Sequence, residues 1–449
     1  MRPIDLSDVD NRRLGTLLRL HAARHPERPF LLTDTETVRY AEANARSNGL
    51  AAGLRSIGIA RGDRVAILMD SAIDYVLLAL ALNKLGAVWV PLNTDYRGEW
   101  LAQAIADSWA SALVVDAPYL PRLQSLEPAP AHGLLIVRGL EAADAAKAGA
   151  RACLGELALP AAPEPDDSGI HTGDTVAVLW TSGTTGRSKG VMQHHNAWVR
   201  AAEHSNRDFG TTGDDVVYNC MPLYNSAAWV ANIFRALVAG IPCALDPQFS
   251  VKEFWNRIRR FGATQTMTLG AMHMFLWAEP ARADDADNPL RMANMVPMPE
   301  PLVKPFCERF GIEGVMQGFG QSEVMLLLSR KDTPEKRWKP NALGAVGPGI
   351  ELRMLDAEGA EVPAGEVGEF CVRPSAPHVM FNGYFANPEA TAAAFFGEWY
   401  RTGDLGIRDA EGDYFFVDRK KDVIRYKGRN VSSVQIEGVV LRHLSLIHI

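Results

Sequence analysis

The sequence has few cysteines and no excess of basic charge. Its five cysteines lie far apart and include no Cys-x-x-Cys pair, a spacing that fits neither a structural zinc site nor a disulfide framework. The formal net charge of −7 argues against broad binding of nucleic acid, which requires a basic face. We therefore expect a protein of a reducing compartment that does not bind nucleic acid.

Long apolar runs are also lacking. The longest, residues 75–92, is interrupted by Asn83, Lys84 and Gly86, which predicts a buried helix followed by a strand rather than a membrane span. Residues 1–13 alternate charged and apolar side chains and show no secretory leader. These features predict a cytoplasmic protein without an integral membrane segment.

The composition, 47% hydrophobic and 22% charged, is typical of a globular protein, and 449 residues exceed one ordinary domain. Near the N-terminus the apolar residues alternate between helical and strand periods, which predicts an α/β fold with a largely parallel sheet. By contrast, the Ala-, Pro- and acid-rich residues 128–167 are predicted to form a variable surface excursion. The predicted helices cover residues 14–25, 41–57, 74–85 and 249–259, and the predicted strands cover residues 30–32, 38–40, 63–69 and 87–92.

The most informative stretch is the loop Thr181–Gly190, with the sequence TSGTTGRSKG. The apolar residues 176–180 before it predict a buried strand, and residues 191–203 after it have helical character. Glycines let backbone N–H groups turn toward an anion, hydroxyls add donors, and Lys189 adds positive charge, so we predict a phosphate-binding loop. The loop differs from the common NTPase loop, because Ser188 stands where that pattern requires its second glycine. A flexible Gly/Ser linker is the alternative.

Three further motifs follow. Residues 317–323 have the sequence QGFGQSE and end in a carboxylate, Glu323. Residues 399–406 (WYRTGDLG) place Asp404 after a glycine, and residues 418–431 form a basic cluster. Taken singly, these motifs are also typical of a Gly-rich strand end, an ordinary turn and a solvated face.

In this order the four motifs resemble the signature segments of the AMP-forming acyl-CoA synthetases and other adenylate-forming enzymes. Residues 92–99 and 249–272 resemble the crotonobetaine/carnitine-type CoA ligases of that superfamily. The resemblance implies ATP, Mg²⁺ and CoA as ligands and a small-molecule carboxylic acid as substrate. It implies that the phosphates of ATP are held by Thr181, Ser182, Gly183, Thr184, Thr185, Gly186 and Lys189.

The resemblance assigns the remaining roles residue by residue. It implies catalytic roles for Lys189, Ser322 and Glu323, with Ser322 also bonding the phosphates and Glu323 also supporting the metal. It implies that Phe319, beside Gly320, lies against adenine. Asp404 would accept the ribose hydroxyls, Arg419 would contact ribose or phosphate, and the segment that includes Lys427 and Gly428 would meet CoA.

The resemblance also implies an architecture. Residues 1–418 would form a large N-terminal adenylating domain of stacked mixed and parallel sheets with helices, including a β-rich subdomain at about residues 340–418. Residues 419–449 would hold the hinge, at Lys421, and only the start of a small C-terminal domain, with a helix from 432 to 443. Family members continue further and supply a lysine that has no match here, so a truncated member is expected. A homodimer is possible.

Two alternatives stay open: an adenylating domain that loads a carrier protein, and a nucleotide- or acyl-binding protein without turnover. Related amino-acid-activating domains carry an aspartate near residues 224–229, and its absence here favours an acid without an α-amino group. Asn225 stands where relatives commonly have histidine or another polar residue. A trimethylammonium group would need an aromatic cage, for which the candidate walls are Trp229, Phe234 and Trp277.

Two clusters suggest metal sites at first sight. His194 and His195 are adjacent on a predicted helix and therefore face different directions, which does not suit one shared ion. Asp284, Asp285 and Asp287 are more typical of a solvated acidic loop. We expect neither cluster to hold a metal.

Overall fold

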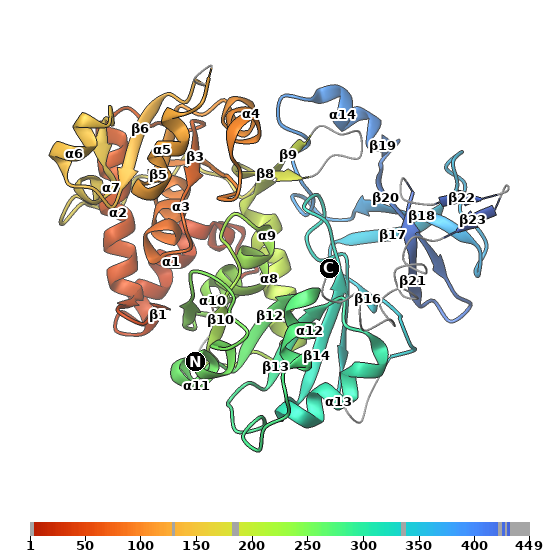
Figure 1. The fold of residues 1–449 in the computed structure, drawn as a ribbon. Coiled ribbons are helices and arrows are strands. Elements are labelled where there is room, and N and C mark those ends of the chain that lie inside the picture. The colour runs from red at the N-terminus through yellow and green to blue at the C-terminus, as the bar shows by residue number, and fades with distance from the viewer. Residues whose placement is uncertain are drawn as a thin grey trace.

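The computed structural model describes residues 4–127, 131–181, 188–333 and 338–420, and the backbone of residues 424–426 and 429–431. Within this part of the chain, the strands form three large sheets and one small antiparallel pair (Figure 1). The small pair joins β22 (Ile424–Tyr426) to β23 (Arg429–Val431).

The first sheet, at the upper left of Figure 1, has seven described strands. Neighbours are parallel except for β8 and β9, which pair antiparallel. Residues 128–167 are not a mere surface excursion, because the apolar run LLIVR within them pairs with β5 and extends the sheet. In spatial order the strands are β7 (Ala152–Cys153), β6 (Leu134–Arg138), β5 (Ala112–Asp116), β3 (Arg64–Leu68), β4 (Val88–Pro91), β8 (Thr175–Thr181) and β9 (Lys189–His194).

The second sheet has nine described strands, parallel in its central part and antiparallel at both edges. The carboxyl ends of its central strands face the site described below. In spatial order they are β16 (Ala345–Val346), β15 (Leu328–Asp332), β14 (Gly314–Phe319), β13 (Met292–Val296), β12 (Gln265–Leu269), β10 (Val217–Asn219), β11 (Cys243–Leu245), β1 (Pro29–Leu32) and β2 (Thr37–Arg39).

The third sheet, at the right of Figure 1, is antiparallel throughout. It confirms the β-rich part that the sequence predicts after the larger sheets. Its strands are β17 (Ile350–Leu355), β18 (Val367–Pro374), β19 (Phe395–Phe396), β20 (Trp399–Arg408) and β21 (Tyr414–Arg419).

One hydrophobic core connects helices to strands of all three large sheets. Nearly every side chain of α3 (Ile73–Leu85) is buried, as expected for a helix that is apolar on all sides. No described helix combines the length and apolar character needed to cross a lipid bilayer. The other helices in this core are α1 (Leu14–Arg24), α2 (Tyr40–Ser56), α7 (Leu154–Leu157), α8 (His195–Phe209), α9 (Ser226–Ala228), the π-helical turn Trp229–Ile233 and α10 (Phe234–Ala239).

The remaining helical segments surround the sheets. They are the 3₁₀ turns Val9–Arg12 and Ala117–Tyr119, α4 (Gly98–Ser108), α5 (Leu120–Gln124), α6 (Ala142–Lys147), α11 (Phe254–Phe261), α12 (Ala271–Ala278), α13 (Glu300–Phe310) and α14 (Pro388–Ala393).

Two predicted element boundaries are wrong. The segment after the Thr181–Gly190 loop begins as a strand, and α8 starts only at His195. Pairing on both edges explains this, since β9 bonds to β8 and also to residues 382–385. The helix predicted from residue 249 starts at Phe254, after a turn in which Ser250 Oγ accepts a bond from the Glu253 N–H. The helix predicted at 432–443 lies outside the described residues.

Candidate functional site

A cavity of about 1040 Å³ lies where the three sheets meet. It brings residues of all four motifs together, although they are spread over more than 200 positions of the sequence. Ser182, Gly183, Thr184, Thr185, Gly186, Lys427 and Gly428 lie outside the described residues. The predicted residues that line the cavity are Thr181, Lys189, Phe319, Gly320, Ser322, Glu323, Asp404 and Arg419.

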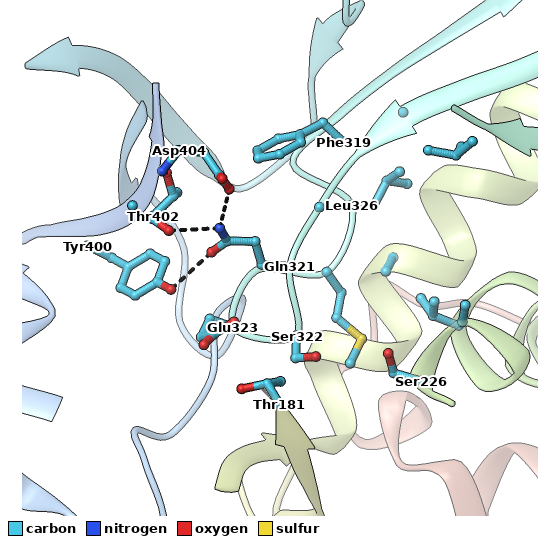
Figure 2. A pocket seen from close by; sticks show the side chains of 18 of the residues that line it. Thr181, Ser226, Phe319, Gln321, Ser322, Glu323, Leu326, Tyr400, Thr402 and Asp404 are labelled. Carbon is cyan, nitrogen blue, oxygen red and sulfur yellow. Dashed lines mark hydrogen bonds between the residues drawn. The ribbon is translucent and has the colours of Figure 1, made fainter. Parts of the chain in front are cut away.

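Most of the lining belongs to two parts, which we call the polar end and the inner end. The other lining residues, which we assign to neither part, are Gly318, Phe319, Gly320, Met325, Leu326, Ala390, Ala393 and Ala394. Figure 2 shows Asp404, Thr402 and Tyr400 on one side of the cavity and Ser226 on the other. The polar end comprises Thr181, Lys189, Gln321, Ser322, Glu323, Glu369, Tyr384, Tyr400, Arg401, Thr402, Gly403, Asp404, Arg419 and Lys420. The inner end comprises Ala201, Ser205, Asn225, Ser226, Ala227, Val230, Ala231, Met267, Leu269, Asn294 and Val296.

Lys189 and Glu323 are held together at the polar end by Tyr384. The Met192 N–H donates to Gly383 O at 3.1 Å, so β9 runs beside the segment that carries Tyr384. The Lys189 ammonium lies 4.7 Å from the centre of the Tyr384 ring, a cation–π contact. The Tyr384 hydroxyl donates to Glu323 Oε1 at 2.9 Å. One tyrosine thus fixes a cation and a carboxylate in the same corner.

Glu323 is a buried carboxylate that faces the cavity, with 8% of its surface exposed. Burial raises its pKa, while the bond from Tyr384 and the charge of Lys189 act in the opposite direction. A buried carboxylate beside open space is a fitting ligand for a hard cation such as Mg²⁺.

Asp404, the second buried carboxylate of the polar end, is fixed by Gln321. The Gln321 amide donates to Asp404 Oδ2 and, at 2.8 Å, to Thr402 O, while the Tyr400 hydroxyl donates to Gln321 Oε1 at 3.0 Å (Figure 2). Arg419 Nε lies 3.7 Å from Asp404 Oδ1. Burial raises the pKa of Asp404 to about 6, with the Gln321 bond and Arg419 opposing the rise.

A bulge in β20 directs Asp404 into the cavity. Residues 402–404 sit opposite a single residue of β18, and Gly403 has a φ of +75°, which an L-residue would adopt only with strain. Buried Glu369 secures the bulge, because its carboxylate accepts bonds from Gly403 N–H at 3.0 Å, Arg401 Nη2 at 2.7 Å and Lys420 Nζ at 3.1 Å.

Sequence reasoning missed Gln321, Glu369, Tyr384 and Tyr400. Gln321 and Tyr400 lie inside recognised motifs, so their proximity to the site could have been inferred. Glu369 and Tyr384 lie in a strand and a loop whose approach to the cavity depends on tertiary pairing, for which the sequence carries no local signal.

The proposed aromatic cage is wrong. Trp229 and Phe234 are fully buried away from the cavity, where the Trp229 ring packs 4.5 Å from that of Trp89. Trp277 does not line the cavity and lies under the guanidinium of Arg309. The residues are therefore core packing and not walls of a ligand site.

The histidine and aspartate clusters are structural. His194 Nδ1 accepts a bond from the N-terminus of α8, and His195 Nδ1 accepts one from the Leu14 N–H. Asp285 is paired with Arg309 at 2.6 Å. Among the described residues, no group of three or more His, Cys, Asp or Glu side chains is arranged to hold a metal.

Comparison with known proteins finds relatives of this chain. The profile of the family described as "AMP-binding enzyme" matches residues 18–385. The crotonobetaine/carnitine–CoA ligase of Escherichia coli is 31% identical over 427 residues, covering 90% of this chain and 78% of the relative.

Solved structures share the fold. The O-succinylbenzoate coenzyme A synthetase of Bacillus subtilis, in complex with ATP and magnesium ion, has a TM-score of 0.79 and 26% identity, covering 95% of this chain and 84% of that chain. The N-terminal domain of FACL13 from Mycobacterium tuberculosis has a TM-score of 0.78 and 26% identity, covering 91% of this chain and 99% of that chain.

The fold and the converging motifs define an adenylate-forming ligase. With the profile match over most of its length and the relative above 30% identity, the chain belongs to the AMP-binding enzyme family. It is an enzyme of the AMP-forming CoA-ligase class.

Proposed function

We propose that this protein joins a carboxylic acid to CoA at the expense of ATP. The carboxylate attacks the α-phosphorus of ATP and displaces pyrophosphate, which leaves an acyl adenylate. The CoA thiol then attacks the acyl carbon, displaces AMP and loses its proton to solvent. The observation that carries the proposal is the convergence of residues from all four motifs on one cavity.

In this proposal the nucleotide occupies the polar end. Phe319, whose ring packs against Phe370 at 5.5 Å and Phe416 at 6.0 Å, offers its face to adenine. Asp404 accepts the ribose hydroxyls once it is ionised, and Arg419 offsets its charge and that of phosphate. The described contacts support these roles, because Phe319, Asp404 and Arg419 all line the cavity and leave its interior open.

The phosphates lie toward Lys189, Thr181 and Ser322, whose donors stabilise the charge that develops on phosphate oxygens during attack. Glu323 supports Mg²⁺, which usually binds one or two carboxylates together with substrate phosphates. When bound, the metal would supply neutralisation of phosphate charge. Residues 182–186 are part of the same proposed cradle.

We also propose the domain division predicted from the sequence, with residues 1–418 as the adenylating domain and the hinge and CoA-contacting segment beyond. The match of this chain to nearly all of a solved N-terminal domain supports it. Limited proteolysis tests it: cleavage at the predicted hinge, Lys421, should be fast in the free protein and slower with a bound acyl-adenylate analogue. A cytoplasmic location and a homodimer stay predictions, open to fractionation and light scattering.

The deciding experiment measures pyrophosphate release from MgATP by the purified chain across a panel of carboxylic acids, with and without CoA. Acid-dependent release, followed by CoA-dependent thioester formation, is expected. Thioester formation on a carrier protein but not on CoA would favour the carrier-loading alternative. ATP binding without release for every acid would favour a binding protein and contradict the proposal.

A further inference from the structure

The inner end differs from the polar end in charge. Every described charged residue that lines the cavity belongs to the polar end, which carries Lys189, Glu323, Glu369, Asp404, Arg419 and their neighbours. The described residues of the inner end carry no charge at all. If ribose lies at Asp404 and the phosphates at Lys189, the acid reaches the α-phosphorus from the inner end, so these neutral walls surround its acyl group.

The walls of the inner end consist of apolar side chains, from alanine to methionine, and neutral polar ones. Ala201 and Ser205 lie one turn apart on α8, Val230 and Ala231 come from the π-helical turn, and Asn294 comes from β13. Ser205 is 8% exposed, so an acyl group that meets it is nearly withdrawn from water. The inner end therefore suits an uncharged acyl group, with or without a hydroxyl or keto substituent.

Charged side chains on the surrounding elements point elsewhere. The Arg200 guanidinium, on α8, donates to Met325 O and Pro348 O. His204 Nε2 contacts Ser329 Oγ and Asp208, and Arg235 bonds to Gln265 and Asn206. None of these three lines the cavity. Within the described chain, the inner end therefore offers no counter-ion to a charged acyl group of either sign.

A permanent cation at the inner end would also lack an aromatic face. A quaternary ammonium is recognised by aromatic rings or by carboxylates. Trp229 and Phe234 are sealed in the core, and the described lining of the inner end contains no aromatic residue. Burying an unpaired charge is strongly unfavourable, because no interaction replaces its hydration.

Building on the proposed function, we infer that the acid activated by this protein carries an uncharged acyl group. A trimethylammonium acid, of the kind named for the Escherichia coli relative, and a dicarboxylic acid, of the kind named for the Bacillus subtilis neighbour, are both poor substrates.

The test uses acids of matched shape. 5,5-Dimethylhexanoate and 4-(trimethylammonio)butanoate differ only in carbon against charged nitrogen, and hexanoate and hexanedioate differ in a second carboxylate. We expect kcat/KM for pyrophosphate release to favour the uncharged member of each pair by about 100-fold or more. Equal or better use of either charged acid would overturn the inference.

Binding separates this inference from the proposed catalysis. Acyl-sulfamoyl adenosines with the same four tails mimic the adenylate and need no turnover. The two neutral analogues should bind at least tenfold more tightly than adenosine 5′-sulfamate, and the two charged ones should not. If no acid is turned over but this order of binding is seen, the inference stands and the proposed activity fails. If all four analogues bind alike, the inference fails whatever the activity.

A negative charge introduced at the inner end provides a further test of where the acyl group lies. Ser205→Asp should raise the relative affinity for the trimethylammonium analogue by at least tenfold, and Ser205→Asn, of similar size and neutral, should keep the preference for neutral tails. An unchanged order in a folded Ser205→Asp protein would contradict the placement of the acyl group at the inner end. Circular dichroism and adenosine 5′-sulfamate binding report whether each variant is folded.

Discussion

The two ends of the cavity are built in opposite ways. At the polar end, three carboxylates are buried and each is fixed by named partners, such as Tyr384 for Glu323 and Gln321 for Asp404. At the inner end the walls are neutral side chains from α8, α9, the π-helical turn, β12 and β13. A polar network fixes the position of charges, whereas a neutral wall mainly selects by shape and by excluding charge.

This comparison predicts that changes at the polar end alter rate and nucleotide dependence but leave acid preference unchanged. For each variant below, the ratio of kcat/KM for hexanoate to that for hexanedioate is therefore the shared control. A variant that changes this ratio severalfold would show that the two ends do not act separately.

Replacement of Glu323 by Gln should have the largest effect. The substitution keeps the shape of the side chain but removes the charge proposed to support Mg²⁺. We expect the rate of adenylation to fall by about 10²–10³-fold and the Mg²⁺ concentration needed for half-maximal rate to rise. Pyrophosphate release over a Mg²⁺ titration measures both. A rate close to that of the unmodified protein would remove Glu323 from the mechanism.

Asp404→Asn should follow, with kcat/KM for ATP lowered by about 100-fold, because two hydrogen bonds to a charged acceptor are weakened. In the unmodified protein, burial raises the pKa of Asp404 to about 6. The KM for ATP should therefore rise as the pH falls through about 6, while the Asn variant should lack this dependence. A flat profile for the unmodified protein between pH 5 and 7.5 would contradict the role of Asp404.

The same pKa carries a stability prediction of definite sign. The folded-state pKa of Asp404 lies above its ordinary value of 3.8, so the folded protein holds this proton more tightly than the unfolded chain. The contribution of Asp404 to the free energy of unfolding is thus greatest below pH 3.8 and is lost as the pH rises to about 6. Urea unfolding measures this free energy. In the Asp404→Asn variant, the loss of stability between pH 3.8 and about 6 should be smaller by the contribution of Asp404.

Tyr384→Phe should lower the adenylation rate by about tenfold, because Glu323 loses a hydrogen bond while the ring under Lys189 stays. The bond from Tyr384 lowers the pKa of Glu323, so its loss raises that pKa and moves the acidic limb of the pH–rate profile to higher pH. Tyr384→Leu should cost about threefold more, since the cation–π contact is lost as well. A rate loss without the shift in pH profile would indicate a purely structural role.

Much of the fold could be predicted from the sequence, because apolar periodicity marks strands such as Arg64–Leu68 and the buried helix Ile73–Leu85. The motifs likewise contain eight predicted site residues that line one cavity, whereas residues 182–186, 427 and 428 lie outside the described chain. The failures have tertiary causes: Val191–His194 forms a strand because two neighbours pair with it, and Tyr384 reaches Glu323 only through that pairing. The prediction of an aromatic cage was wrong because the sequence alone cannot show whether a residue such as Trp229 lines a cavity or is buried in the core.

Replacement of Gln321 should have the smallest effect at the polar end. Gln321 contacts Asp404, but we do not propose that it contacts the nucleotide. Gln321→Leu should raise the KM for ATP by about fivefold, as expected for one lost hydrogen bond, with little change in kcat. Gln321→Glu should do more, because a second carboxylate beside Asp404 raises the Asp404 pKa further and moves the pH dependence of KM upward. Electrostatics therefore predicts that the KM for ATP differs between the two variants at pH 6 and is similar at pH 8. The opposite result, with similar KM values at pH 6 and different ones at pH 8, would contradict this prediction. The hydrogen bonds from Tyr400 to Gln321 and from Gln321 to Asp404 would then contribute to packing and not to the charge state of Asp404.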